Sequence, residues 1–194
     1  MKYVLGLTGP TGAGKSTAAG VAKELGWYVI DCDKTVREAY KREEVLKSLI
    51  SVFGADVVKN GLLDRKTLAA RAFATKESTE LLNKTVLPFI IEMVNEEIAA
   101  CKADKILLDA PTLYESGADG ICNAVCALFS KEENRLGRII ARDGIDEEAA
   151  RLRMSAGKSE EYYKARTGYI IYNDAGEEAL KEDFARLLKN LGGN

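Results

Sequence analysis

The sequence predicts an α/β fold with three layers, in which helices cover both faces of a parallel sheet of about five strands. The first observation is the start of the chain, where an apolar run at residues 3–8 is followed by a glycine-rich turn at 9–14 and a helix-like segment at 15–25. A β-rich run at residues 27–30 completes a strand–loop–helix–strand unit, which is how parallel sheets begin. The second observation is that further short apolar runs recur, at residues 105–109, 124–129 and 169–172.

Two helical insertions interrupt this sheet. No convincing buried strand occurs between residues 34 and 104, where the pattern predicts helices over 34–53, 66–74, 77–86 and 88–101, with a turn or short hairpin over 54–61. Pro88 suits the first turn of the last of these helices. Residues 134–166 are charged, helical and rich in arginine, and an amphipathic helix over 177–191 closes the chain.

The composition excludes several classes of function. Lys and Arg number 28 and Asp and Glu 30, so the formal net charge of −2 creates no general attraction to nucleic acid, and no apolar run approaches membrane-spanning length. The absence of histidine excludes histidine-ligated metal sites and Ser-His-Asp or Cys-His catalysis. The four cysteines match no zinc or redox spacing, so we expect reduced thiols in a cytoplasmic protein that binds neither nucleic acid nor membrane.

The glycine-rich turn carries a phosphate-binding motif. Its residues, Gly9-Pro10-Thr11-Gly12-Ala13-Gly14-Lys15-Ser16 followed by Thr17, match the P-loop signature G-x-x-x-x-G-K-[ST]. The glycines let main-chain N–H groups turn inward around phosphates, and the helix N-terminus adds its positive dipole end. Lys15 is expected to reach the β- and γ-phosphates, and Ser16 to bind Mg²⁺. The sequence therefore predicts a P-loop NTPase fold that binds ATP and magnesium.

Other P-loop classes fit the sequence less well than a kinase does. Asp109 ends an apolar strand, where a carboxylate can hold the hydration shell of Mg²⁺, but no adjacent Glu follows it to activate water as in a hydrolytic motor. A GTPase-like switch is disfavoured because Asn83-Lys84-Thr85-Val86 has Val86 where the guanine-reading motif needs Asp. We therefore expect transfer of the γ-phosphoryl group of ATP to a small-molecule hydroxyl.

Two carboxylates, Asp31 and Asp33, follow the second strand. In open parallel sheets ligands bind at the carboxyl ends of the strands, and a carboxylate there can accept the proton of an attacking hydroxyl. One or both could instead cap the next helix; if the strand ran through them, they would share a face across Cys32 and could bind substrate hydroxyls together. We expect Asp33 to be the base, because it is the later of the two and reaches further beyond the sheet.

Arginines in the second insertion repeat at helical spacing. Arg135, Arg138 and Arg142 are three and four residues apart, so on a helix they form one basic stripe that can bind ATP phosphates. The alternative is a solvated face whose arginines form ion pairs, for example with Asp143 or Glu132. Because the stripe follows a P-loop and precedes the last strand, we favour phosphate binding.

Segments over most of the chain resemble the dephospho-CoA kinase family. They are residues 6–17, 29–33 with Arg37, 61–65 with Leu68 and Phe73, Leu87-Pro88, 107–115, Arg138, Arg142-Asp143 and 171–174. Asp31-Cys32-Asp33 and the run from Leu107 to Glu115 narrow the resemblance from P-loop proteins in general to this family. It implies ATP-dependent phosphorylation of the ribose 3′-hydroxyl of dephospho-CoA to coenzyme A, within a fold that has a five-stranded parallel core, a helical CoA-binding domain and a lid.

The resemblance also implies boundaries and residue roles. The core would comprise residues 1–33, 105–133 and 167–194, the CoA-binding domain 34–104 and the lid 134–166. Asp33 resembles the family's catalytic base, and Lys15 and Arg138 its phosphate-binding cations. Arg142 and Asn173 are expected on the nucleotide side, with Asn173 in the adenine-side loop. Residues expected to bind the acceptor are Asp31, Arg37, Leu87, Pro88, Asp109, Pro111 and Glu115.

The chain departs from the family at two positions that bear on the acceptor. Leu87 stands where the family often has His, and Gly157 where its lid usually carries Gln. The alternatives are another small-molecule or nucleoside monophosphate kinase, and a nucleotide-sensing regulatory domain of the same fold.

Overall fold

The computed structural model describes residues 2–192. The chain folds into two compact units. The sheet unit is built from residues up to Ile30 and from Lys102 onward, and the helical unit spans Asp31–Cys101. No helix in the part of the chain that the structure describes is long and apolar enough to cross a membrane.

The sheet has five strands in the order β2-β5-β1-β6-β7. They are β1 (Tyr3–Thr8), β2 (Tyr28–Asp31), β5 (Lys105–Asp109), β6 (Ala124–Phe129) and β7 (Tyr169–Tyr172). The pairs β1–β5, β1–β6 and β6–β7 are parallel, which confirms the predicted parallel α/β sheet. Because β1 is central, the loop that follows it lies at the carboxyl edge of the sheet, between the ends of β5 and β6.

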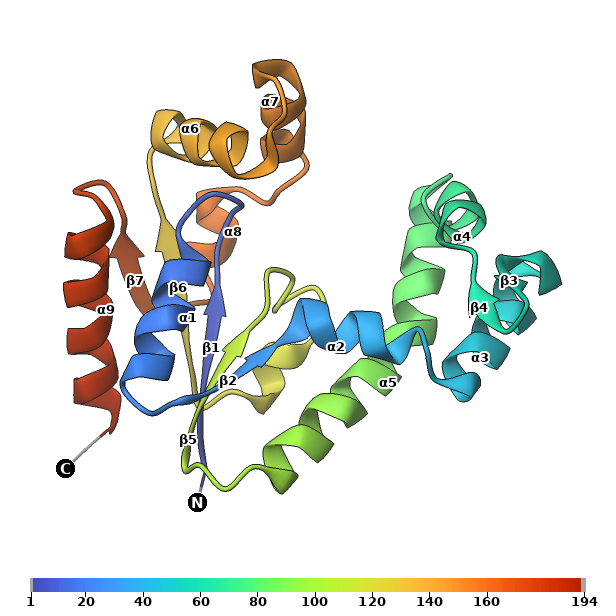
Figure 1. The fold of residues 1–194 in the computed structure, drawn as a ribbon, viewed down its shortest axis with the longest axis horizontal. Helices are drawn as coiled ribbons and strands as arrows, with labels where there is room; N and C mark the ends of the chain where they lie inside the picture. The colour runs from blue at the N-terminus through green and yellow to red at the C-terminus, as the bar shows by residue number, and fades with distance from the viewer. Residues whose placement is uncertain (1, 193–194) are drawn as a thin grey trace. The chain divides into compact units, whose positions relative to one another are not determined.

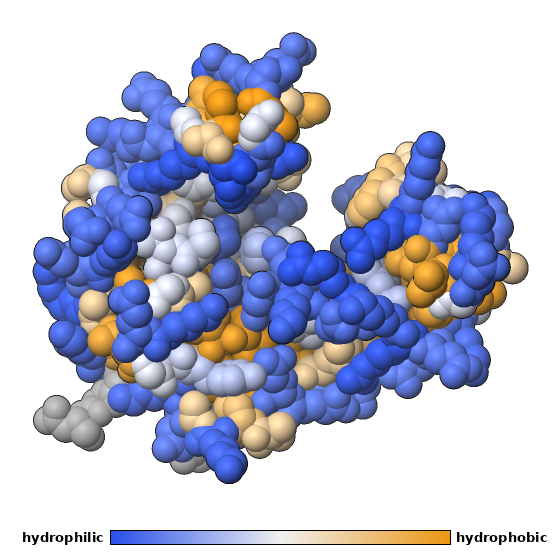
Figure 2. All heavy atoms as spheres, viewed as in Figure 1, coloured by the Kyte–Doolittle hydropathy of each residue, from blue (hydrophilic) through white to orange (hydrophobic). Residues whose placement is uncertain are grey.

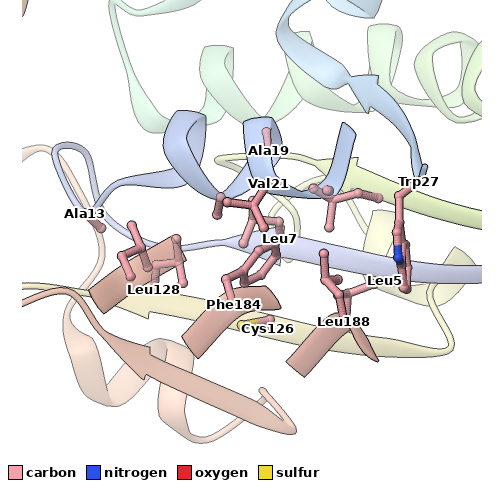
Figure 3. Close-up of a cluster of buried hydrophobic side chains, with 14 residues drawn as sticks. Leu5, Leu7, Ala13, Ala19, Val21, Trp27, Cys126, Leu128, Phe184 and Leu188 are labelled. Atoms are coloured by element: carbon pink, nitrogen blue, oxygen red, sulfur yellow. The ribbon is translucent and has the colours of Figure 1, made fainter. Parts of the chain in front are cut away.

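Two helices cover one face of this sheet. Helix α1 (Lys15–Glu24) and helix α9 (Glu177–Gly192) pack on a buried cluster that includes Leu5 and Leu7, which alternate along β1 and so point to the same side. Figure 3 shows Phe184 and Leu188 of α9 reaching this cluster.

The opposite face is covered by the segment that follows β5 and by a short helix. A Cβ added to Gly6 would lie 2.8 Å from Leu113 Cδ2 and 2.9 Å from Cys122 Sγ, so this segment packs directly on β1. It includes the 3₁₀ helix η2 (Ala118–Ile121). Tyr163 of α8 (Glu160–Lys164) is buried against Phe129 of β6, with ring centroids 6.0 Å apart.

The charged segment predicted over 134–166 is helical, as expected. It forms α6 (Glu132–Asp143), α7 (Glu147–Ser155) and α8, of which α6 and α7 lie beyond the carboxyl ends of β1 and β6 (Figure 1). Asp146 and Ser159 accept hydrogen bonds from main-chain N–H groups in the first turns of α7 and α8 and so set where these helices begin.

The helical unit contains four α-helices, one 3₁₀ helix and a two-stranded hairpin. These elements are α2 (Cys32–Ala39), α3 (Glu43–Phe53), η1 (Ala55–Val57), β3 (Val58–Lys59), β4 (Leu62–Leu63), α4 (Arg65–Ala72) and α5 (Lys76–Ala100). The hairpin matches one of the two predictions for 54–61. Figure 2 shows hydrophobic surface over the hairpin and α3, and Leu62 at the hairpin is 70% exposed.

The prediction of a single helix over 34–53 was wrong, because the segment forms two helices, α2 and α3. The chain leaves α2 through tight bonds from Lys41 N–H to Glu38 O and from Arg42 N–H to Ala39 O, and Arg42 has extended backbone dihedrals. A new helix then begins with Glu43 and Glu44 in its first turn, where negative charge favours the positive end of the helix dipole.

The prediction of separate helices over 77–86 and 88–101 was also wrong, because α5 runs through Pro88 without a break. Proline removes one helical hydrogen bond and bends a helix, and Figure 1 shows α5 changing direction along its length. The helix continues because Leu82, Val86, Ile90 and Val94 are buried at a regular spacing of four residues on both sides of the proline.

Candidate active site

The phosphate loop has positive φ angles at its three glycines, of which Gly9 and Gly14 are the most constrained. Gly9 has φ 131° and Gly14 has φ 111°, in the region that residues with a Cβ rarely adopt. A Cβ at Gly9 would lie 2.2 Å from Leu128 O, and one at Gly14 would lie 2.5 Å from Asn173 Nδ2. Both glycines are therefore required by conformation and by close packing.

Side chains from outside the loop hold three consecutive carbonyl oxygens of its backbone. Arg135 Nε donates to Thr11 O at 2.9 Å, and Arg138 Nη1 donates to Gly12 O at 3.2 Å. Asn173 Nδ2 donates to Ala13 O at 3.0 Å. A peptide group is planar and trans, so each carbonyl held on one side directs the N–H of the same peptide to the other side. The Ala13 N–H of the middle peptide donates to Pro10 O at 3.3 Å, so the N–H groups that this arrangement offers to an anion are those of Gly12 and Gly14.

Lys15 bonds carbonyl oxygens at the start of the loop. Its ammonium donates to Gly9 O at 2.7 Å and to Pro10 O at 3.4 Å. Helix α1 starts at Lys15 with no side-chain cap and no acidic residue in its first turn, so nothing negative there competes with a phosphate for the helix N-terminus. Ser16 is the exposed residue of this first turn, and Thr17 after it is half-buried.

The arginine stripe on α6 divides into two parts. Arg135 and Arg138 reach the phosphate loop, whereas Arg142 donates to Asp143 at 2.8 Å and 2.9 Å. Asp143 also pairs with Arg153 of α7, and its pKa is lowered, mainly by the hydrogen bond from Arg142. Arg142 thus makes the ion pair that was the alternative for the stripe, and the pair between Asp143 and Arg153 links α6 to α7.

The segment after β5 adjoins the start of the loop. Asp109 is in register with Leu7, and Ala110 N–H donates to Leu7 O at 3.1 Å. The hydroxyl of Thr8, which is fully buried, donates to Pro111 O at 3.4 Å. Asp109 and Pro111 therefore lie at the carboxyl edge of the sheet, beside the phosphate loop.

Glu115, further along this segment, lies near the aromatic residues of α8. Its charge contributes to the raised pKa of both Tyr162 and Tyr163, after the larger effect of burial. One of its carboxylate oxygens, Oε2, is buried and has no hydrogen-bond partner among the described residues.

Asp31 and Asp33 do not lie on a common face of a strand, as they would if β2 continued through them. Strand β2 ends at Asp31 and α2 begins at Cys32, because the Asp31 carboxylate accepts the Lys34 N–H at 3.1 Å and caps the helix. Asp33 is exposed in the first turn of α2 and, within residues 2–192, makes no hydrogen bond or ion pair. The cap therefore occupies one carboxylate and leaves the other available to a ligand.

The helical unit contains a cavity of about 290 Å³. Its walls are mostly apolar and come from α2, α4, α5 and the hairpin; the lining residues are Val36, Arg37, Tyr40, Leu63, Arg65, Leu68, Ala69, Phe73 and Leu82. Neither Arg37 nor Arg65 forms an ion pair within the described part of the chain. Burial raises the pKa of Tyr40, which keeps its hydroxyl neutral. Leu87 and Pro88 are not among the lining residues.

Comparison with known proteins places this geometry in one family. The family model described as dephospho-CoA kinase matches residues 3–179. The dephospho-CoA kinase of Fusobacterium nucleatum is 34% identical over 97% of this chain and 98% of its own. The chain belongs to the dephospho-CoA kinase family.

Solved structures agree with this assignment. TT1252 from Thermus thermophilus is 29% identical, with a TM-score of 0.84 and 99% of both chains covered. A dephospho-CoA kinase from Campylobacter jejuni is 25% identical, with a TM-score of 0.72 and 98% of both chains covered. The family resemblance and the P-loop kinase fold expected from the sequence are therefore confirmed.

Two residues of this candidate site were not singled out from the sequence. Arg135 was recognised only as part of a stripe, yet it holds Thr11 O as closely as Arg138 holds Gly12 O. Ser130 was not considered, yet its hydroxyl donates to Asn173 O at 2.7 Å and accepts from Arg138 Nη1 at 3.1 Å. The spacing of Arg135 and Arg138 was a usable signal; a single serine after a strand carries none.

Proposed function

We propose that this member of the dephospho-CoA kinase family transfers the γ-phosphoryl group of ATP to the ribose 3′-hydroxyl of dephospho-CoA, which yields coenzyme A and ADP. The observation that carries the proposal is the phosphate loop itself, whose three outward carbonyls are held by Arg135, Arg138 and Asn173. A loop oriented before ATP arrives binds phosphates without the cost of reorganisation, which is the main protein contribution to phosphoryl transfer.

Two cations would act on the phosphates of ATP. Lys15, whose ammonium now bonds Gly9 O, would contact the β- and γ-phosphates. Arg138 would exchange the Gly12 carbonyl for a phosphate oxygen as negative charge develops during transfer. Charged donors of this kind, placed before the reaction, stabilise the transition state more than the ground state.

Magnesium fits the donors at the loop. The Ser16 hydroxyl is exposed at the start of α1, and the Asp109 carboxylate ends the strand beside β1, so both supply the oxygen atoms that magnesium prefers. Bound there, the ion would neutralise charge on the β- and γ-phosphates.

Asp33 would accept the proton of the acceptor hydroxyl. The support is the contrast between its unengaged carboxylate and the carboxylate of Asp31, which caps α2. Asp31 would then act on the acceptor only indirectly, by setting the start of the helix that carries Asp33.

The cavity of the helical unit would hold the pantetheine arm of the acceptor. Its apolar walls suit a flexible chain, and the guanidinium groups of Arg37 and Arg65 suit the phosphates at the end of that chain. At about 290 Å³ the cavity is just smaller than the usual ligand pocket of about 300 to 1,000 Å³, so it fits part of the acceptor rather than all of it.

One assay tests the proposal against its alternatives. ADP release is measured with ATP, Mg²⁺ and, in turn, dephospho-CoA, AMP, CMP, UMP and adenosine, with Lys15→Ala as the inactive control. We expect release that depends on dephospho-CoA. Release that depends on a nucleoside monophosphate instead would assign another kinase activity, and ATP binding with no acceptor-dependent release would favour a regulatory domain.

We also propose a cytoplasmic location for this activity. The support is that all four cysteines are free thiols, as expected of a protein from a reducing compartment.

A further inference from the structure

Asn173 is buried and is held from several sides. Its exposed fraction is 4%, and its main-chain N–H donates to Phe129 O at 2.7 Å. Its main-chain oxygen accepts from Ser130 Oγ at 2.7 Å and from Arg138 Nη2 at 3.2 Å. The residue is thereby fixed at the end of β7, which belongs to the sheet and not to the helices beyond it.

From this fixed position the side chain acts on one peptide of the phosphate loop. Asn173 Nδ2 donates to Ala13 O at 3.0 Å, and the same nitrogen would be 2.5 Å from a Cβ on Gly14. The Ala13 carbonyl and the Gly14 N–H belong to one planar peptide and point in opposite directions. The bond therefore directs the Gly14 N–H away from Asn173. Without it, this peptide would be free to rotate, because glycine restricts its own dihedrals so little.

The other polar atom of the same amide, Oδ1, makes no bond among the described residues, so the bond from Nδ2 to Ala13 O is what the amide contributes. Asn173 Oδ1 is buried and has no hydrogen-bond partner within residues 2–192. A buried acceptor without a partner is unfavourable, and an apolar side chain of similar size would avoid that cost. Rotating the amide would bring Oδ1 against the Ala13 oxygen, so only the observed orientation makes a bond.

Asn173 also differs in kind from the other two donors to the loop. Arg135 and Arg138 come from α6, in the segment expected to act as a lid, whereas Asn173 comes from the sheet. If α6 moves, Asn173 loses its bond from Arg138 but keeps those to Phe129 and Ser130, which hold it beside the loop.

We propose that Asn173 is a positioning residue for the phosphate loop: its amide fixes the Ala13–Gly14 peptide so that the Gly14 N–H faces the phosphates. This rests on the proposed binding of ATP at the loop and replaces the expectation that Asn173 serves the adenine side. The adenine base is then not what Asn173 recognises.

The first test separates phosphate binding from adenine recognition. The affinities of wild type and of Asn173→Leu are measured for ATP and for inorganic tripolyphosphate, which has no base. We expect both ligands to bind about 10-fold or more weakly to the variant, as for the loss of one hydrogen bond to a charged group. Tripolyphosphate affinity equal to that of wild type, with ATP affinity reduced, would overturn the proposal in favour of an adenine contact. No acceptor is used, so failure of the dephospho-CoA assignment leaves this result interpretable.

The second test covers the case in which Asn173→Leu does not fold. In Asn173→Asp the carboxyl group can donate to Ala13 O only when protonated, and burial raises the pKa of a carboxyl group. The tripolyphosphate affinities of the variant and of wild type are compared at the same pH. We expect the affinity of the variant to approach that of wild type as the pH falls from about 8 to about 6. Tyr172→Phe, on the neighbouring exposed residue, is the matched control and should follow wild type at every pH. If the tripolyphosphate affinity of Asn173→Asp, divided by that of wild type at the same pH, did not change with pH, the proposal would also be overturned.

Discussion

Arg138 of α6 donates a hydrogen bond to the main-chain oxygen of Gly12 at 3.2 Å, so a helix of the charged segment and the phosphate loop are joined directly. Movement of α6 away from the loop must break this bond, and a phosphate oxygen of ATP can replace the carbonyl as its acceptor. The loop and the expected lid are therefore joined by the guanidinium groups of Arg138 and Arg135, which bonds Thr11 O from the same helix.

The first prediction follows from that coupling. Arg138→Ala should lower kcat by about 10²–10³-fold, the effect of losing one preorganised donor, while the KM for dephospho-CoA changes little. Arg142→Ala is the matched comparison on the same helix and should cost less, because Asp143 already engages its guanidinium group. Equal losses of kcat in the two variants would show that the contacts of Arg138 with the loop do not contribute to catalysis.

A second prediction concerns the motion of residues 134–166. Amide hydrogen exchange in α6 and α7 should slow when ATP is added, because the phosphates give the arginines of α6 stronger partners than carbonyl oxygens. Exchange is compared with and without ATP in wild type and in Arg135→Ala. Protection that is the same in both conditions in wild type would argue against a moving lid.

The third prediction concerns Lys15. Lys15→Ala should abolish measurable transfer, with a loss of at least about 10²–10³-fold, because the ammonium group faces the loop and no other lysine lies in it. Thermal unfolding should be close to wild type, since Lys15 is not part of the buried core. A variant that folds and keeps near-normal turnover would contradict the assignment of the phosphate loop.

The fourth prediction separates the two aspartates. Asp33→Asn should keep ATP affinity and lose about 10²–10⁴-fold in single-turnover transfer, the usual contribution of a positioned base. Asp31→Asn should keep most activity, because asparagine also caps helices, whereas Asp31→Ala should cost about 0.5–2 kcal/mol of stability. A severe defect in Asp31→Asn with a mild one in Asp33→Asn would reverse the roles.

A fifth prediction concerns the acid stability of the helical unit. The pKa of Asp64 is lowered by its hydrogen bond from Lys59 and by the Thr67 N–H that it caps. A carboxylate with a lowered pKa in the folded state stabilises the fold above its unfolded pKa of about 3.9, and this stabilisation is lost as the pH falls further. Wild type should therefore lose more stability than Asp64→Asn between about pH 5 and pH 2 in denaturant unfolding. Parallel pH profiles would contradict the role of this carboxylate.

Much of this architecture could be predicted because its signals are local. The alternation of Leu5 and Leu7, the glycines at positions 9, 12 and 14, and the helix that starts at Lys15 each follow from a few neighbouring residues. The boundary between strand β2 and helix α2 was harder to predict, because Asp31-Cys32-Asp33 fits both the end of a strand and the start of a helix. Only the hydrogen bond from Lys34 to Asp31 decides between them.

Residues far apart in the chain decided the rest. Asn173 and Ala13 are separated by 160 positions, and Arg138 and Gly12 by 126, so no local pattern could pair them. Likewise α5 continues through Pro88 because Leu82 and Val86 on one side and Ile90 and Val94 on the other are all buried, which outweighs the local preference of proline to begin a helix. The sequence alone specified the phosphate loop and the order of the strands along the chain, because short-range sterics and hydrophobic period control both. Which side chains hold that loop depended on the packed fold, because a hydrogen bond requires the final distance between its two groups.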